Sequence, residues 1–265
     1  MIKYELIVPT RLTNSPTLVV GFPGLRPLKE GTRVRQQLEY LRELGHHALL
    51  VDYADITEKN CGNLLECRPD INAEDIRETA AHIAEDLHVI PSRTAIIASS
   101  MGAIPAARYL MSLKPQEQPG VFISTSPLPG WPQFLTPEAR APYEHGQRDL
   151  PVPTLEDINL GRQRIIVKSS LLDLVRVDCL AELEKRKPIN FQTMSTLTIM
   201  GKHDKISSPE GMKRFHLALN GINENLIQLD SNHDLVQKAP TEQKQRDLNE
   251  IVYEFFQRYL PISVR

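Results

Sequence analysis

The sequence has few cysteines and no long apolar run, and these absences argue against a disulfide-rich protein and against a membrane-spanning one. Its 265 residues contain three cysteines, Cys61, Cys67 and Cys179, and no Cys-x-x-Cys pair. This odd count predicts neither a disulfide framework nor a thiolate zinc site, while a Cys61–Cys67 bridge in an oxidising compartment stays open. No stretch of about 18 apolar residues occurs, and the start MIKYELIVPT has no apolar core before a cleavage site. We therefore expect a cytoplasmic protein without a membrane span.

A strong charge of either sign is also missing. The 31 Lys and Arg residues face 33 Asp and Glu residues, the formal net charge is −2, and no long basic run occurs. This balance argues against nucleic acid or an anionic membrane as the main partner. No group of His, Cys, Asp and Glu has metal-ligand spacing, and the turn GFPG is neither a dinucleotide nor a phosphate-loop motif. We expect a small-molecule substrate, no cofactor and no metal, and a homodimer stays open.

Strand-like and helix-like segments alternate along most of the chain. The strand-like segments are short, apolar and rich in β-branched residues, whereas the helix-like segments carry apolar residues at helical spacing. The expected strands are 3–9, 17–22, 48–53, 94–100, 120–126, 195–201 and 225–230, and the expected helices are 33–47, 72–90, 101–110, 208–221 and 241–260. Continuous apolar strands alternating with amphipathic helices predict an α/β fold, with a mostly parallel central sheet covered by helices on both faces.

This alternation stops in the middle of the chain. Nine of the 20 prolines lie between Pro115 and Pro153, and only 169–186 reads as one or two short helices. We interpret 127–190 as a helical and proline-rich cap inserted into a core formed by 1–126 and 191–265. The alternative is a disordered linker between two domains, but the strands after the insertion are too few to form a second domain.

The stretch ASSMG, residues 98–102, joins a strand to a helix and offers two candidate nucleophiles. A nucleophile on such a tight turn needs small residues two positions before and after it. Ala98 and Gly102 meet this need for Ser100, whereas large side chains flank Ser99 at the same spacing. The pattern therefore selects Ser100, against the alternative that the serine only allows close packing of helix on strand.

Four further features lie at the place where the carboxyl ends of the expected strands meet. VVGFPG ends a strand in a glycine-flanked turn whose backbone N–H groups are unobstructed, and a helix starting at Met101 directs its positive end at the same place. Asp204 follows the strand 195–201, and His233 follows the strand 225–230. Because the carboxyl ends of parallel strands meet at one edge, Ser100, Asp204 and His233 form a candidate triad in the chain order Ser, Asp, His.

Other residues offer weaker alternatives. Asp230 and Asp234 compete with Asp204 as the acid, but both lie too near His233 along the chain to reach its far nitrogen easily. We interpret His203 as a loop histidine without a role. His46 and His47 are expected to end the helix 33–47, where a cation favours the helix dipole, and to be structural.

Together these motifs resemble the α/β-hydrolase superfamily over nearly the whole chain. The segments LVVGFPG, ASSMG, LTIMGKHDKISSPEGMKRF and NHDL are similar to those of small esterases, acyl hydrolases and serine-aminopeptidase-like members. The resemblance implies Ser100 as nucleophile, His233 as general base and Asp204 as the acid that orients it. It also implies an oxyanion hole made by the backbone N–H groups of Phe22 and Met101.

The implied activity is hydrolysis of a carboxylic ester or thioester through an acyl-enzyme. An aminopeptidase or amidase with the same triad, a hydrolase-fold ligand-binding protein with little turnover, and acyl transfer to an acceptor other than water stay open. Trp131, Phe134 and Tyr143 in the proline-rich region are candidates for lining an acyl pocket, and ordinary packing of the cap explains them equally well.

Overall fold

The computed structural model describes the following parts of the chain: 3–11, 15–24, 33–52, 73–128, 150–151, 166–167, 179–186, 193–204, 207–232, 235 and 241–260. Cys61, Cys67, His233 and Asp234 lie outside them, as do Trp131, Phe134, Tyr143 and most of the predicted cap. None of the helices in these parts is long and apolar enough to cross a membrane.

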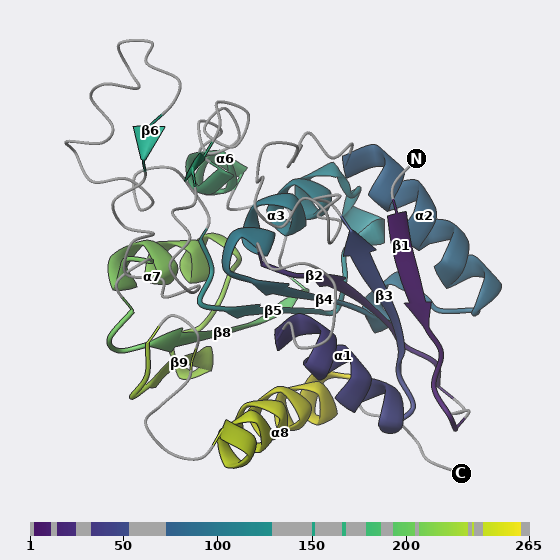
Figure 1. The fold of residues 1–265 in the computed structure, drawn as a ribbon. Helices are drawn as coiled ribbons and strands as arrows, with labels where there is room; N and C mark the ends of the chain where they lie inside the picture. Colours follow the sequence, from purple (N-terminus) through teal and green to yellow (C-terminus); the bar gives the residue numbers. More distant parts are fainter. Residues whose placement is uncertain are drawn as a thin grey trace.

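A seven-stranded sheet forms the centre of the molecule (Figure 1). Its strands are β1 (Lys3–Ile7), β2 (Leu18–Phe22), β3 (His47–Asp52), β4 (Thr94–Ser99), β5 (Val121–Thr125), β8 (Ser195–Gly201) and β9 (Leu226–Leu229). The spatial order is β1-β3-β2-β4-β5-β8-β9; β1 is antiparallel to β3, and the other neighbours run parallel. The carboxyl ends of the six parallel strands therefore meet at one edge, which we call the carboxyl edge, opposite the amino edge.

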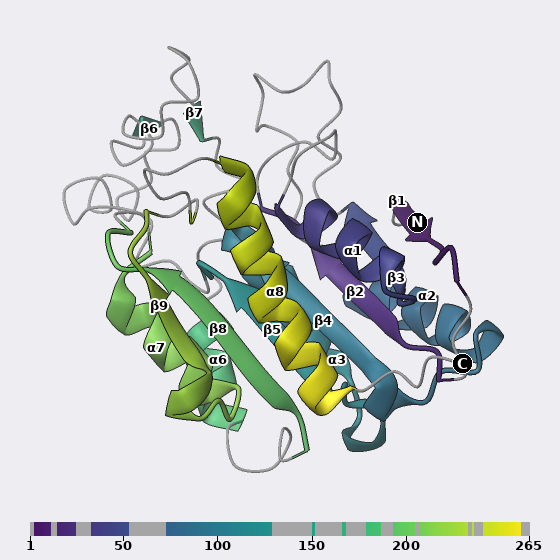
Figure 2. The same cartoon turned by 90° about the horizontal axis from the view of Figure 1, so that it is seen from below.

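Helices cover both faces of this sheet, as the alternation predicted. The α-helices are α1 (Arg33–Glu43), α2 (Ala73–Asp86), α3 (Ala103–Ser112), α6 (Cys179–Arg186), α7 (Pro209–Ala218) and α8 (Thr241–Tyr259), and the short 3₁₀ turns are η3 (Pro91–Arg93), η4 (Ser100–Gly102), η5 (Pro115–Glu117) and η8 (Asn223–Asn225). Figure 2 shows α1 and α8 on one face, with α2, α3, α6 and α7 behind the sheet.

The alternating side chains of the strands explain why both faces are covered. In β4, Ile96 and Ala98 join the core beneath α2 and α3, whereas Ala95 and Ile97 join the core beneath α1 and α8. All of these side chains are fully or almost fully buried. A strand that is apolar on both faces needs a helix on each side, since successive side chains point to opposite faces.

Within 127–190, the structure describes a two-residue pair, β6 (Leu150–Pro151) with β7 (Ile166–Val167), and the helix α6. Cys179, Leu180 and Leu183 of α6 are buried in the core beneath α3. This helix therefore belongs to the layer that covers the sheet, and the extent of the cap stays a prediction.

The expected cationic role of His46 and His47 is wrong. Helix α1 ends at Glu43, and His47 is already the first residue of β3. His46 is buried against Thr17, whose hydroxyl hydrogen-bonds its Nδ1, and its ring meets that of Phe256 edge-on at 5.2 Å. Burial, aided by the Arg93 cation, lowers the pKa of His46 to about 4, so that this structural histidine is neutral at pH 7.

Candidate active site

The turn after β4 holds Ser100 in an unusual backbone conformation. Ser100 has a φ of 51°, in the left-handed region that a non-glycine residue adopts at a cost of about 1–3 kcal/mol. It is half-buried, whereas Ser99 is the last residue of β4 and is buried. Ser99 faces α1, where its Oγ lies 3.3 Å from Nη1 of Arg33 and accepts a hydrogen bond. The two adjacent serines therefore have different surroundings, and only Ser100 stands on the turn itself.

Two glycines allow this turn to lie against the end of β2. A Cβ on Gly102 would lie 2.2 Å from the carbonyl oxygen of Phe22 and 2.5 Å from that of Pro23. A Cβ on Gly24 would lie 3.2 Å from Cβ of Ser100. The sequence predicted that position 102 needs a small residue. The structure gives the reason, because backbone carbonyl groups at the end of β2 occupy the space that a side chain at this position would need.

The backbone groups expected to form an oxyanion hole lie beside the turn. Phe22 is the last residue of β2 and pairs in register with Ala98 of β4. Met101 follows Ser100 directly, is buried, and belongs to the 3₁₀ turn η4 that leads into α3. The amino end of α3 carries no acidic residue in its first turn and directs its positive dipole end toward the turn at Ser100. The placement is compatible with the expected role of both N–H groups.

The candidate acid lies past the end of β8, two strands away from the serine. Asp204 is 8 % exposed, and its Oδ1 accepts a hydrogen bond of 2.9 Å from the backbone N–H of Ser207. The residues after β5 connect the two positions: Ser126 N–H donates to Ile199 O of β8, and Leu128 N–H donates to Ser100 O. Ser100 and Asp204 therefore lie along the same edge, held by a shared segment.

The acid turn also packs against the chain that leads to the candidate base. The backbone N–H of His203 donates to Ser231 O at 2.9 Å. A Cβ on Gly201 would lie 2.2 Å from Asn232 O, so that only glycine permits this approach. Residue 232 directly precedes His233, which lies outside the described residues, as does the competing acid Asp234. The structure thus brings the serine, the acid and the approach to the base together at the carboxyl edge.

Asp230, the other competing acid, has a different environment. Its Oδ1 lies 2.7 Å from Nε2 of His203, and both side chains are exposed, His203 at 64 % and Asp230 at 79 %. The sequence predicted no role for His203, because its partner lies 27 residues away along the chain in another loop. A solvent-exposed carboxylate already engaged by another imidazole is a poorer candidate than the buried Asp204.

The sequence reasoning missed four buried hydroxyl groups near the acid. Thr125, Ser126, Ser207 and Ser231 are each at most 3 % exposed, and their hydroxyl oxygens have no hydrogen-bond partner among the described residues. Their signal in the sequence was a concentration of small polar residues, STS, ISS and DSN, just after the predicted strands. Among the described residues, no group of three or more His, Cys, Asp or Glu side chains is arranged to hold a metal ion.

Comparison with solved structures agrees with this architecture. No family model and no curated protein matches the sequence. The structure is similar to Est1E from Butyrivibrio proteoclasticus, solved with ferulic acid bound (TM-score 0.65, 14 % identity, 98 % of this chain and 95 % of that one). It is also similar to the esterase Est2 from Thermogutta terrifontis (0.61, 15 %, 100 % and 92 %) and the monoacylglycerol lipase of Paleococcus ferrophilus (0.58, 16 %, 96 % and 99 %).

These similarities extend over nearly the full length of each chain at low sequence identity. Together with the seven-stranded sheet, they show that the chain has the α/β-hydrolase fold, which confirms the fold class expected from the sequence. A shared fold hosts many activities, so the chemistry has to be argued from the site.

Proposed function

We propose that the protein is a serine hydrolase that cleaves a carboxylic ester or thioester. In this proposal Ser100 is the nucleophile, His233 the general base, and Asp204 the acid that orients the base. The backbone N–H groups of Phe22 and Met101 bind the developing oxyanion. Cytoplasmic location remains a prediction from the sequence, and a homodimer stays open.

The observation that carries the proposal is the conformation of Ser100. Five described residues other than glycine have a positive φ, and Ser100, at φ 51°, is the one of them that lies directly between a strand and a helix, with Gly24 and Gly102 in close approach. Such a turn presents the hydroxyl at the top of the sheet and places the next backbone N–H beside it. Strain of this kind at a strand end supports a nucleophile rather than a packing residue.

The reaction follows from these positions. His233 takes the proton of the Ser100 hydroxyl as its oxygen attacks the carbonyl carbon, and the carbonyl oxygen becomes an oxyanion held by the two N–H groups. The intermediate collapses, the carbon–oxygen or carbon–sulfur bond of the leaving group breaks, and His233 donates its proton to that group. Water then attacks the acyl-enzyme in the same manner and releases the carboxylic acid and free Ser100.

The names of the similar structures favour an ester over an amide. One is described as an esterase with propionate bound and another as a monoacylglycerol lipase. Ester cleavage also makes the smaller demand on the site, since an alkoxide or thiolate leaves more readily than an amine. An aminopeptidase or amidase activity stays the alternative, and a panel of p-nitrophenyl esters set against aminoacyl-anilides separates the two.

The decisive test is covalent labelling of the folded protein with a fluorophosphonate probe. We expect the wild-type protein and Ser99→Ala to be labelled, and Ser100→Ala to remain unlabelled. Ser99→Ala is the matched control because the neighbouring hydroxyl is removed while the turn is kept. The Ser100→Ala variant should also lose about 10⁴- to 10⁶-fold in kcat with its thermal midpoint unchanged or raised. A folded wild-type protein that does not label would overturn the proposal.

A further inference from the structure

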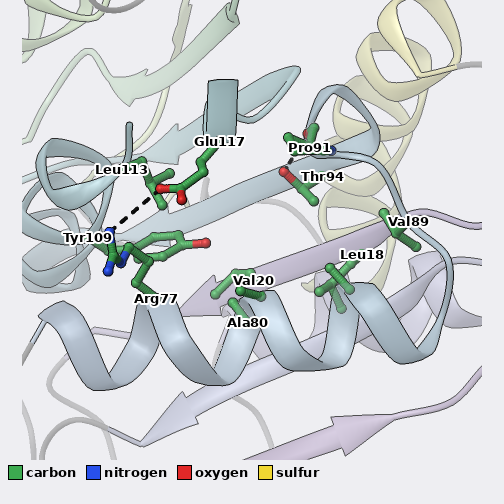
Figure 3. A pocket seen from close by; sticks show the side chains of 12 residues that line it. Leu18, Val20, Arg77, Ala80, Val89, Pro91, Thr94, Tyr109, Leu113 and Glu117 are labelled. Carbon is green, nitrogen blue, oxygen red and sulfur yellow. Dashed lines mark hydrogen bonds and ion pairs between the residues drawn. The ribbon is translucent and has the colours of Figure 1, made fainter. Parts of the chain in front are cut away.

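A cavity of about 80 Å³ lies on the α2 and α3 face, at the amino edge of the sheet (Figure 3). It is lined by Leu18, Val20, Arg77, Ala80, Ala81, Ala84, Val89, Pro91, Thr94, Tyr109, Leu113 and Glu117. Leu18 and Thr94 are the first residues of β2 and β4, and Ser100 lies beyond the other end of β4. Val20, which also lines the cavity, pairs with Ile96 of β4, so that along the strand, at about 3.3 Å per residue, it lies about 13 Å from Ser100. A molecule in it therefore does not share the proposed active site.

The walls of the cavity are mainly apolar, and small residues leave it open. Leu18 and Val20 of β2 form the floor, and Val89 closes one end (Figure 3). The side facing them is contributed by α2, which presents three alanines here, Ala80, Ala81 and Ala84. A larger side chain at Ala80, which is buried, or at Ala84, which is half-buried, would occupy the space.

One polar group is directed into this apolar space. Tyr109 of α3 is 7 % exposed, its ring packs on that of Phe22 at 5.9 Å, and Figure 3 shows its hydroxyl pointing into the cavity. That hydroxyl has no hydrogen-bond partner among the described residues. Burial, with the nearby Glu117 carboxylate, raises the pKa of Tyr109, which keeps the hydroxyl protonated as a donor. The hydroxyl is not among the fully buried polar atoms without a partner, so it is accessible from the cavity and can donate a hydrogen bond to a ligand there.

The other polar groups of the lining are already engaged. Nη1 of Arg77 lies 3.8 Å from Oε2 of Glu117, which also accepts from the backbone N–H of Lys114 at 2.9 Å. The hydroxyl of Thr94 donates to Pro91 O at 2.7 Å. The charges at this end thus compensate each other, and a neutral ligand is favoured over an ion.

We propose that this cavity binds one small neutral organic molecule with a single oxygen acceptor, such as a short-chain ketone or alcohol. Its oxygen accepts a hydrogen bond from the Tyr109 hydroxyl, and its alkyl part packs on Leu18, Val20 and Val89. Its size follows from the volume: an engineered apolar cavity of about 150 Å³ holds benzene, so that about half this space suits a molecule smaller than benzene. Because a molecule this small makes few contacts, we expect a dissociation constant on the order of 1 mM.

The test uses the Ser100→Ala protein, so that no reaction at the other edge interferes, and 2-butanone as the probe. We expect saturable shifts in the NMR signals of the Leu18, Val20 and Val89 methyl groups. Ala84→Leu, or Ala80→Val if the first variant does not fold, should abolish them by filling the cavity. Glu78→Leu, on the exposed side of α2, is the matched control and should bind as before. Tyr109→Phe should weaken binding about tenfold, the cost of one lost hydrogen bond.

Three results would overturn the proposal. The methyl signals could remain unshifted as 2-butanone is raised far above the expected dissociation constant, which would indicate that water fills the cavity. The shifts could persist in a folded Ala84→Leu or Ala80→Val protein, which would place the ligand elsewhere. Unchanged affinity in Tyr109→Phe would show that the Tyr109 hydroxyl does not bind the ligand, and the proposal of a ligand with an oxygen acceptor would fail. None of these outcomes depends on whether Ser100 is a nucleophile.

Discussion

The two edges of the sheet use polar side chains in different ways. At the amino edge such groups tie chain segments together: Thr17 hydrogen-bonds His46, and the guanidinium of Arg93 donates to the carbonyl oxygens of Ser15 and Pro16 at 2.9 and 3.2 Å. At the carboxyl edge Ser100 is held in a left-handed conformation, and four neighbouring hydroxyls are buried without a partner among the described residues. The amino edge also has buried polar atoms without a partner among the described residues, Nε2 of His46, Nδ1 of His47 and Oε1 of Gln118. The two edges therefore differ in the strained serine and the cluster of unpartnered hydroxyls, which oppose folding at the carboxyl edge.

This difference is the one expected between a structural and a functional edge. Strained backbone and unpaired polar groups persist where they serve binding or catalysis, and the rest of the fold offsets their free-energy cost. Substitutions at the amino edge should therefore lower the free energy of unfolding. Substitutions of Ser100 or of the buried, unpartnered hydroxyls at the carboxyl edge should instead leave stability unchanged or increased, and that of Ser100 should abolish activity.

After that of Ser100→Ala, the largest expected effect is the loss of activity in Asp204→Asn. An amide keeps the oxygen that accepts from Ser207 N–H, so we expect the fold to survive. It lacks the charge and the acceptor geometry that orient a histidine, and kcat should fall about 10³- to 10⁴-fold. Steady-state kinetics on a p-nitrophenyl ester, with thermal denaturation as the check on folding, measures this.

Asp230→Asn is its matched control at the same edge. Because Asp230 is exposed and paired with His203, the substitution should change kcat less than about threefold, as for other surface positions. If Asp230→Asn lost the activity and Asp204→Asn kept it, the acid assignment would be wrong.

The elements of the fold were predictable because their signals are local. In β4 and β8, continuous apolar runs with β-branched residues indicated buried parallel strands, and both runs form such strands. The turn at Ser100 was also predictable, since small residues at positions 98 and 102 mark it within five positions of the chain.

Contacts between distant segments could not be predicted in this way. His46 was expected to be a cation at a helix end, but Thr17 and Phe256, 29 residues before it and at the other end of the chain, bury it as a neutral group. The His203–Asp230 pair and the cavity beneath α2 depend likewise on how loops and helices from separate parts of the sequence meet. A local pattern carries no information about such neighbours.

The second expected effect is a pH dependence of stability that arises at the amino edge. The pKa of His46 is lowered to about 4 in the folded protein, against about 6.5 in the unfolded chain. Between these values the unfolded chain binds a proton that the folded protein does not. The stability is therefore fully present above pH 6.5 and is lost as the pH falls toward 4, by on the order of 3 kcal/mol.

Urea denaturation at a series of pH values checks this, with His46→Gln as the variant that cannot titrate. Its free energy of unfolding should fall less steeply than that of the wild type, and the part that remains includes His216 and His47, whose pKa values are also lowered by burial. His82→Gln, at an exposed position on α2, should leave the wild-type slope in place. Identical slopes for His46→Gln and the wild type would exclude His46 as the cause.

The third prediction compares two glycines at opposite edges, each of which lies so close to a backbone carbonyl oxygen that a Cβ would clash with it. A Cβ on Gly120 would lie 2.2 Å from Ser92 O at the amino edge, and a Cβ on Gly201 would lie 2.2 Å from Asn232 O at the carboxyl edge. Both alanine variants should lose about 1–3 kcal/mol of stability, because backbone has to shift in each. Only Gly201→Ala should also lose kcat, by about 100-fold, since the shift displaces the segment that leads to His233.

Kinetics below the unfolding transition of both variants separates the two effects. Equal losses of kcat in Gly120→Ala and Gly201→Ala would mean that activity follows global stability and that the edges do not differ in function.

The smallest expected effect is the change in stability when a single buried hydroxyl is removed at each edge. Thr17→Val removes the hydroxyl that bonds His46 and should cost about 1 kcal/mol of stability, since a buried imidazole nitrogen loses its partner. Ser231→Ala removes a buried hydroxyl that has no partner among the described residues, and the relief of its desolvation should leave stability unchanged or raise it by up to about 1 kcal/mol. Denaturation midpoints of the two proteins, measured at pH 7.5 where His46 is neutral, give the comparison directly. A loss of stability in Ser231→Ala as large as that in Thr17→Val would mean that the hydroxyl of Ser231 is bonded in solution, and the contrast between the edges would then rest on Ser100 and the remaining hydroxyls.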